Sequence, residues 1–82
     1  GTPAIRRGWV KAYLLAGSSP SRFHLVHREG GTERTLSYLY GDEQELRALS
    51  GRQVMVRGRD FWVTGQRLPL MRIEQIQVLE TP

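Results

Sequence analysis

The sequence has 82 residues, enough for one domain with a core of modest size. It contains no cysteine, which excludes disulfide bridges and cysteine-based zinc sites, and no apolar run approaches the ~20 residues that span a bilayer. Twelve basic residues against eight acidic ones give a net charge of +4. Such a balance favours nucleic acid, anionic lipid or an acidic partner. Eleven of the twelve are arginine and asparagine is absent, so a compositional habit of the source organism is the competing explanation.

The first expected strand covers residues 5–15. Val10, Ala12 and Leu14 alternate in it with aromatic and basic residues, which is typical of a strand with one buried face. Gly8 is expected to mark a bend or bulge, because a first barrel strand has to curl over both halves of the sheet.

A second strand is expected at residues 22–28 and a third at 33–40. The paired glycines Gly30-Gly31 between them favour a tight hairpin, because glycine accepts the positive φ that such turns require. Leu36 shares one side of the third strand with two tyrosines, so the sequence leaves open which side of this strand faces the core.

A short helix is predicted at residues 43–50, with Asp42 as its N-cap. A long strand, 52–63, follows it, and the last strand covers 68–79. The apolar residues of the last strand change phase half-way, which predicts a bulge near residues 74–75.

The elements therefore follow the order β-β-β-α-β-β, in an all-β protein with a small α content. This order predicts a five-stranded Greek-key barrel of the OB-fold type over residues 1–82, as a single domain with the helix plugging one end. An SH3-like or Sm-like barrel is the main alternative, although an Sm-like helix would precede the first strand. The chain does not begin with methionine, so we expect it to be part of a longer protein.

The sequence predicts a protein that is not an enzyme and that has no metal site or cofactor. His24 and His27 lie three residues apart on a strand and so point to opposite faces, where they cannot share a metal. The acidic residues at 42–45 are explained by capping of the helix, and neither phosphate-loop motif occurs.

Two groups of residues are candidates for ligand binding. The first is on the outward side of strands one to three, the usual ligand face of this barrel, and comprises Trp9, Lys11, Tyr13 and His24. The third strand could add Tyr38 and its neighbour Tyr40. Rings beside a cation can stack the bases of single-stranded nucleic acid. The alternative is that Trp9 and Tyr13 pack against a neighbouring domain or the N-terminal arm.

The second group lies in the expected hairpin 57–67 and comprises Arg57, Arg59, Trp62 and Arg67. Basic residues interleaved with aromatic ones are typical of nucleic-acid interfaces. The alternative is that Phe61 continues the core face, that Trp62 covers the barrel rim, and that the arginines pair with Asp60 and Glu74.

The segment 46–79 resembles an OB-like domain of uncharacterised bacterial proteins. The resemblance consists of the leucine-containing helix, the pattern G-x-x-V-x-V-x-G at residues 51–58, the Trp-Val pair at 62–63 and Leu-Pro-Leu at 68–70. Some of these proteins are exported and carry bacterial SH3-type repeats nearby. The resemblance implies a protein of the cell envelope with unknown activity, while the sequence itself leaves the location open.

The leading hypothesis is a non-catalytic accessory module that mediates interaction or assembly, with other domains of its parent protein or another protein as partner. The alternative hypothesis is an OB-fold domain that binds single-stranded nucleic acid.

Overall fold

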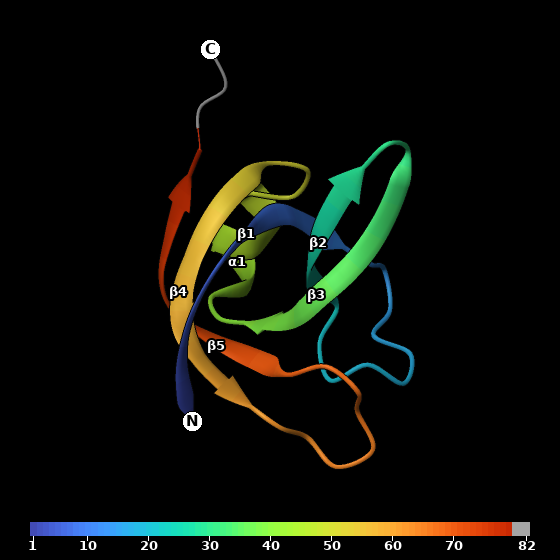
Figure 1. Ribbon diagram of the computed structural model, residues 1–82, viewed down its shortest axis with the longest axis vertical. Helices are drawn as coiled ribbons and strands as arrows, with labels where there is room; N and C mark the ends of the chain where they lie inside the picture. Colours follow the sequence, from blue (N-terminus) through green and yellow to red (C-terminus); the bar gives the residue numbers. More distant parts are fainter. Residues whose placement is uncertain (80–82) are drawn as a thin grey trace.

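The computed structural model describes residues 1–79 and shows a closed five-stranded barrel with one short helix (Figure 1). Its elements are β1 (Thr2–Ala12), β2 (Phe23–Glu29), β3 (Thr32–Tyr40), α1 (Glu43–Ala48), β4 (Gln53–Phe61) and β5 (Leu70–Val78). The strand order around the barrel is β1-β2-β3-β5-β4, with β1 and β4 closing the circle. Only the β3–β5 pair is parallel. The predicted all-β barrel and the position of its helix are confirmed.

Strand β1 belongs to both halves of the barrel. It pairs with β4 from Thr2 to Trp9 and with β2 from Trp9 to Ala12. Gly8 lies where the strand changes partner, and a Cβ placed there would be 2.5 Å from the carbonyl oxygen of Val26. The chain therefore needs glycine at this bend, as the sequence predicted.

The expected boundaries of β1 were wrong at both ends. The strand begins at Thr2 and stops at Ala12. Leu14, which was expected to point into the core, is 86% exposed in the loop that follows. The alternation of apolar residues continues beyond Ala12, the last residue of β1 that pairs with β2.

Two bulges bring apolar residues of both phases to one core. On β5 the extra residue is Glu74, since Arg57 pairs with Gln75 and the next residue pairs with Ile73. This bulge was predicted. On β3 the extra residue is Leu36, which the register between β2 and β3 skips, and the shift decides the open question about this strand. Ser37 is buried on the inner side, while the two tyrosines beyond it lie on the outer side.

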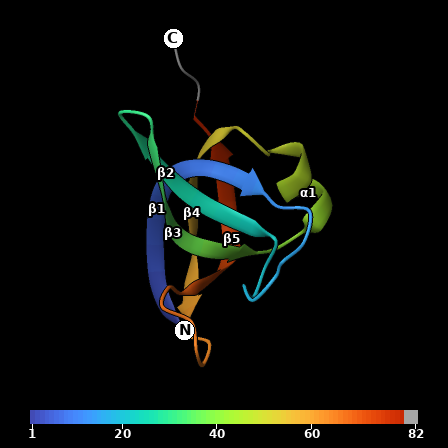
Figure 2. The ribbon, with the colours of Figure 1, turned by 90° about the vertical axis from the view of Figure 1, so that its right-hand side faces the viewer.

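Helix α1 covers one end of the barrel, beside the end of β1 (Figure 2). The side chain of Asp42 accepts a hydrogen bond from the backbone N–H of Glu45 at 3.0 Å, so the predicted N-cap is confirmed. Leu46 is 2% exposed and joins the core. Gly51 lies between the helix and β4 and has φ +81°, a backbone conformation that favours glycine. The helix is too short to be stable alone, so its packing on the barrel stabilises it. No helix of residues 1–79 is long and apolar enough to cross a membrane.

An ion pair lies inside the opposite half of the barrel. Asp60 points inward, is 8% exposed, and accepts two hydrogen bonds from Arg6 at 2.6 and 2.7 Å. The hydrogen bonds to Asp60 raise the pKa of Arg6 above its usual value. The alternative in which Asp60 pairs with the arginines of the hairpin is therefore wrong. Phe61 was expected to continue the core, but it lies on the outer side and is 38% exposed.

Candidate binding surfaces

A row of three rings crosses the outer side of the first half of the barrel. The rings belong to Tyr13, His24 and Tyr38, and we call them the ring row. The ring centroids of Tyr13 and His24 are 4.5 Å apart, and those of His24 and Tyr38 are 4.8 Å apart. The ammonium group of Lys11 lies 5.2 Å from the Tyr13 ring centroid. Three of the four residues of the first predicted group therefore lie together, and Tyr38 joins them.

His24 is the buried centre of this row, with only 9% of its surface exposed. Loss of solvent lowers its pKa, so the ring is neutral at pH 7. Its Nδ1 atom has no hydrogen-bond partner among the described residues. His24 therefore supports the two tyrosines from below, and it is they that present surface to a ligand. His27, beyond it on β2, pairs with Glu29 at 3.3 Å.

Glu33 binds both cations beside the ring row and offsets part of their charge. Its carboxylate forms ion pairs with Lys11 and, at 3.1 Å, with Arg28. Hydrogen bonding between Lys11 and Glu33 raises the pKa of the lysine and lowers that of the glutamate. The guanidinium of Arg28 in turn lies 5.6 Å from the ring centroid of Trp9. This face consequently offers aromatic surface beside two cations that already share a carboxylate.

The outer side of the other half carries four arginines: Arg7 on β1, Arg57 and Arg59 on β4, and Arg72 on β5. We call this the arginine face. Arg59 and Arg72 are directly opposite in the register, an arrangement in which like charges repel. Glu74, at 3.5 Å from Arg59, is the only carboxylate paired with these four side chains among residues 1–79. Stacking of Arg72 on Phe61, at 5.5 Å, adds an aromatic ring to this face.

The remaining predicted residues, Trp62 and Arg67, lie in the loop 62–69 that follows β4. Trp62 is 67% exposed, so the alternative in which it covers the barrel rim is wrong. The Gln66 amide donates a hydrogen bond to the carbonyl of Ser18 at 2.7 Å, which connects this loop to the loop 13–22. The structure thus separates the second predicted group into a strand part and a loop part.

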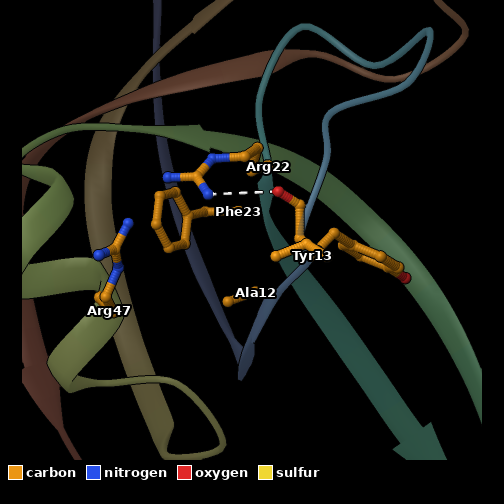
Figure 3. Close-up of a pocket in the computed structure, with 6 residues that line it drawn as sticks. Ala12, Tyr13, Arg22, Phe23 and Arg47 are labelled. Atoms are coloured by element: carbon orange, nitrogen blue, oxygen red, sulfur yellow. Dashed lines mark hydrogen bonds between the residues drawn. The ribbon is translucent and has the colours of Figure 1, made fainter.

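A hollow of about 370 Å³ lies between the end of β1, the start of β2 and helix α1 (Figure 3). Its lining residues are Ala12, Tyr13, Leu14, Arg22, Phe23 and Arg47. We call it the arginine hollow, because the guanidinium groups of Arg22 and Arg47 stand at its rim. Neither arginine was among the predicted site residues.

Within the part of the chain that the structure describes, no three His, Asp or Glu side chains are grouped to hold a metal ion. Comparisons of the chain with protein-family models, with curated proteins and with solved structures found no match. The surfaces of the barrel therefore carry the functional argument.

The residues that the sequence reasoning missed owe their place to pairing between distant segments. Arg72 lies opposite Arg59 because of the β4–β5 register. Arg47 lies near Arg22 because helix α1 packs against the barrel there. The place of Arg72 between the apolar residues Met71 and Ile73 was the one available signal for it. No pattern in the sequence indicated that Arg22 and Arg47 lie at one hollow.

Proposed function

We propose that this chain is a non-catalytic binding module of the OB-fold type that attaches its parent protein to a protein partner. The observation that carries the proposal is the exposure of large apolar side chains on two loops that are joined to each other. Leu14 and Leu15 are 86% and 78% exposed in the loop 13–22, and Trp62 is 67% exposed in the loop 62–69. The bond from Gln66 to Ser18 connects the two loops.

Exposed side chains of this size favour association with another surface. Burying a leucine or a similar side chain stabilises a complex by roughly 1.5–3 kcal/mol before the costs of association. Single exposed apolar residues are common, whereas adjacent ones on connected loops are typical of interaction sites. The strand order and the helix between β3 and β4 support the OB assignment, since they give the connectivity predicted for that barrel.

The resemblance of segment 46–79 to OB-like domains of bacterial envelope proteins supports a location at the cell envelope. In that setting the partner is another domain of the same protein or a protein of the envelope. The matching positions Val54 and Val56 are fully buried, so they serve the fold and leave recognition to the loops.

Selection of peptides from a random display library, with the purified module as bait, tests the proposal. We expect enriched peptides whose binding is lost in the double variant Leu14→Ser/Leu15→Ser. Ile5→Ser is the matched control, because Ile5 is 66% exposed on a different part of the surface. Failure to enrich any peptide that depends on the two leucines would contradict the proposal.

A second candidate function, binding of single-stranded nucleic acid, is favoured by the arginine face. There Arg72 lies over the 38% exposed ring of Phe61, and Arg57 and Arg59 follow on the same side of β4, which combines phosphate contacts with a stacking surface. The ring row supports it less, because Glu33 occupies its cations. Titration of a fluorescent oligothymidylate at rising salt tests this function. Binding that weakens steeply with salt supports it, and no binding at low salt excludes it.

A further inference from the structure

The arginine hollow has two arginines at its rim that share one carboxylate outside its lining. Both Arg22 and Arg47 contact the same oxygen, Oε1 of Glu43, with Arg47 at 2.9 Å. Two cations thus share a single carboxylate, which leaves one positive charge without a counterpart in this cluster. Each guanidinium has five N–H donors, so most of the donors remain for a second anion.

The position of the two guanidinium groups makes them accessible from the hollow. The side chains of Arg22 and Arg47 are 31% and 65% exposed. Figure 3 shows Arg22 at the start of β2 and Arg47 on the helix, with both guanidinium groups near the ring of Phe23. Arg22 is held over the Phe23 ring at 5.6 Å and makes a long contact, 3.4 Å, to the carbonyl of Leu14. The cationic rim is therefore partly fixed before any ligand arrives.

The remaining walls of the hollow are apolar. They come from the side chains of Ala12, Leu14 and Phe23, with Tyr13 beside them. A ligand that fits this hollow combines one negative charge with apolar surface. A polyanion carries several negative charges, whereas this cluster has one positive charge without a counterpart. Nucleic acid therefore fits the arginine face better than it fits this hollow.

An open strand edge lies beside the hollow. Pairing of β1 with β4 ends at Trp9, and the N–H and C=O groups of Val10 bond to Arg52 and Gly51. By the alternation of a strand, the backbone groups of Ala12 point to the same side as those of Val10, where β4 no longer follows. An extended segment lying there can pair with Ala12, as in recognition by strand addition.

We propose that the arginine hollow binds a carboxylate carried by an extended apolar segment of the partner protein. This inference rests on the proposed docking function and specifies the chemistry of the partner. The carboxylate binds to the sides of Arg22 and Arg47 that face the hollow, whose lining does not include Glu43, and the planar guanidinium groups match its two oxygens. The neighbouring apolar side chain of the segment packs against Phe23 and Leu14. The carboxylate comes from an acidic side chain or from the end of a chain.

Four short fluorescent peptides distinguish these sources in fluorescence polarisation. One pair is Ser-Val-Thr-Val-Leu with a free carboxyl end or with an amide end. The other pair is Ser-Val-Glu-Val-Ser or Ser-Val-Gln-Val-Ser, both amidated. We expect at least one carboxylate peptide to bind about tenfold more tightly than its neutral analogue, the factor that one charge-assisted bond of about 1.4 kcal/mol supplies. The pair that shows the difference identifies the source.

Variants locate the binding in the hollow. Arg47→Gln is expected to weaken the carboxylate peptide about tenfold and to leave the neutral analogue unchanged. Arg34→Gln is the matched control, because Arg34 is an exposed arginine in the β2–β3 hairpin, away from the hollow. Amide chemical shifts of Arg22 and Ala12 should move with the peptide in NMR spectra, which also confirm that each variant is folded.

Two outcomes overturn the inference, and they differ in what they mean for the proposed function. Equal binding of the acidic and neutral peptides, lost in the Leu14→Ser/Leu15→Ser variant, rejects the carboxylate site and keeps the docking function. No binding of any of the four peptides, together with an empty library selection, rejects both. An effect of Arg34→Gln as large as that of Arg47→Gln also rejects the site, because the attraction would then be general charge.

Discussion

The two outer faces of the barrel both carry basic residues, but they differ in how many of these residues are paired with a carboxylate. Beside the ring row, Lys11 and Arg28 share the carboxylate of Glu33. On the arginine face four arginines have one paired carboxylate, that of Glu74, among residues 1–79. The half below the arginine face instead has its ion pair inside, between Arg6 and Asp60.

This difference shows that net charge alone says little about where an anion would bind. Strand pairing brings four arginines with one paired carboxylate to one face, while on the face with more aromatic rings both Lys11 and Arg28 are bound to Glu33. The same difference distinguishes two roles of acidic residues, one in stability and one in ligand binding. A carboxylate inside the barrel contributes to stability, and one on the outer side adjusts the attraction for ligands.

The largest effect is expected from Gly58→Ala, in the half that carries the arginine face. A Cβ at this position would overlap the backbone carbonyl oxygen of Arg72, so β4 and β5 would have to separate. We expect a loss of about 2–4 kcal/mol in the free energy of unfolding, measured by urea denaturation. Gly41→Ala is the control, because its Cβ would meet only the side chain of Ile73, at 3.3 Å or more and without backbone contact, and a much smaller change is expected.

Asp60→Asn tests whether the carboxylate inside the barrel contributes more to stability than the carboxylate of Glu33 on the outer side. Removing the carboxylate leaves Arg6 without its partner in the barrel, and we expect a loss of about 2 kcal/mol, less than for a fully buried pair because Arg6 keeps 25% of its side chain exposed. Glu33→Gln, on the outer side, should leave the urea midpoint nearly unchanged. A larger loss for Glu33→Gln than for Asp60→Asn would contradict this division of roles.

If nucleic acid binds, the arginine face should carry its salt dependence. Each phosphate contact to a single strand contributes about 0.7 to the slope of log K against log salt, so Arg57→Gln/Arg72→Gln should reduce the slope by about 1.4. Glu33→Gln should leave it unchanged, whereas binding on the ring row would become tighter in that variant. The comparison requires only fluorescence titrations of one oligonucleotide at several salt concentrations.

The smallest effect concerns pH and the buried ring of His24. Burial lowers the pKa of His24, so below about 6.5 the unfolded chain takes up a proton that the folded chain does not. Stability should therefore fall by less than about 1 kcal/mol as the pH drops from 7.5 to 5.5, and level off once the pH is below the folded pKa. His24→Gln should lose this dependence in urea titrations at the two pH values, and His27→Gln should retain it.

Much of the barrel could be predicted from the sequence because its signals are local. The Asp42 cap, the glycine after the helix and the phase change around Glu74 depend on neighbouring residues. The phase of β3 could not be predicted, since the extra residue Leu36 is defined only by its register with β2. The end of β1 was missed for a similar reason, because alternation continues to Leu14 where no strand lies beside it.

The candidate sites were harder to predict because they depend on which strands become neighbours. Residues close in the chain stayed on one side of the sheet, as Lys11 and Tyr13 did. Partners from other strands, such as Glu33 beside Lys11, reduce the ability of a basic residue to attract a ligand, because they form an ion pair with it. Charge pairing across a barrel has no local signature, so a sequence shows the cations without showing which are free.

The double pairing of β1 has a consequence for how the molecule opens. A strand that is hydrogen-bonded to β2 at one end and to β4 at the other cannot leave one half intact while the other melts. Its amide protons should exchange with solvent only when the whole domain unfolds, so the barrel behaves as one cooperative unit. A ligand that stabilises either face then protects both against proteolysis.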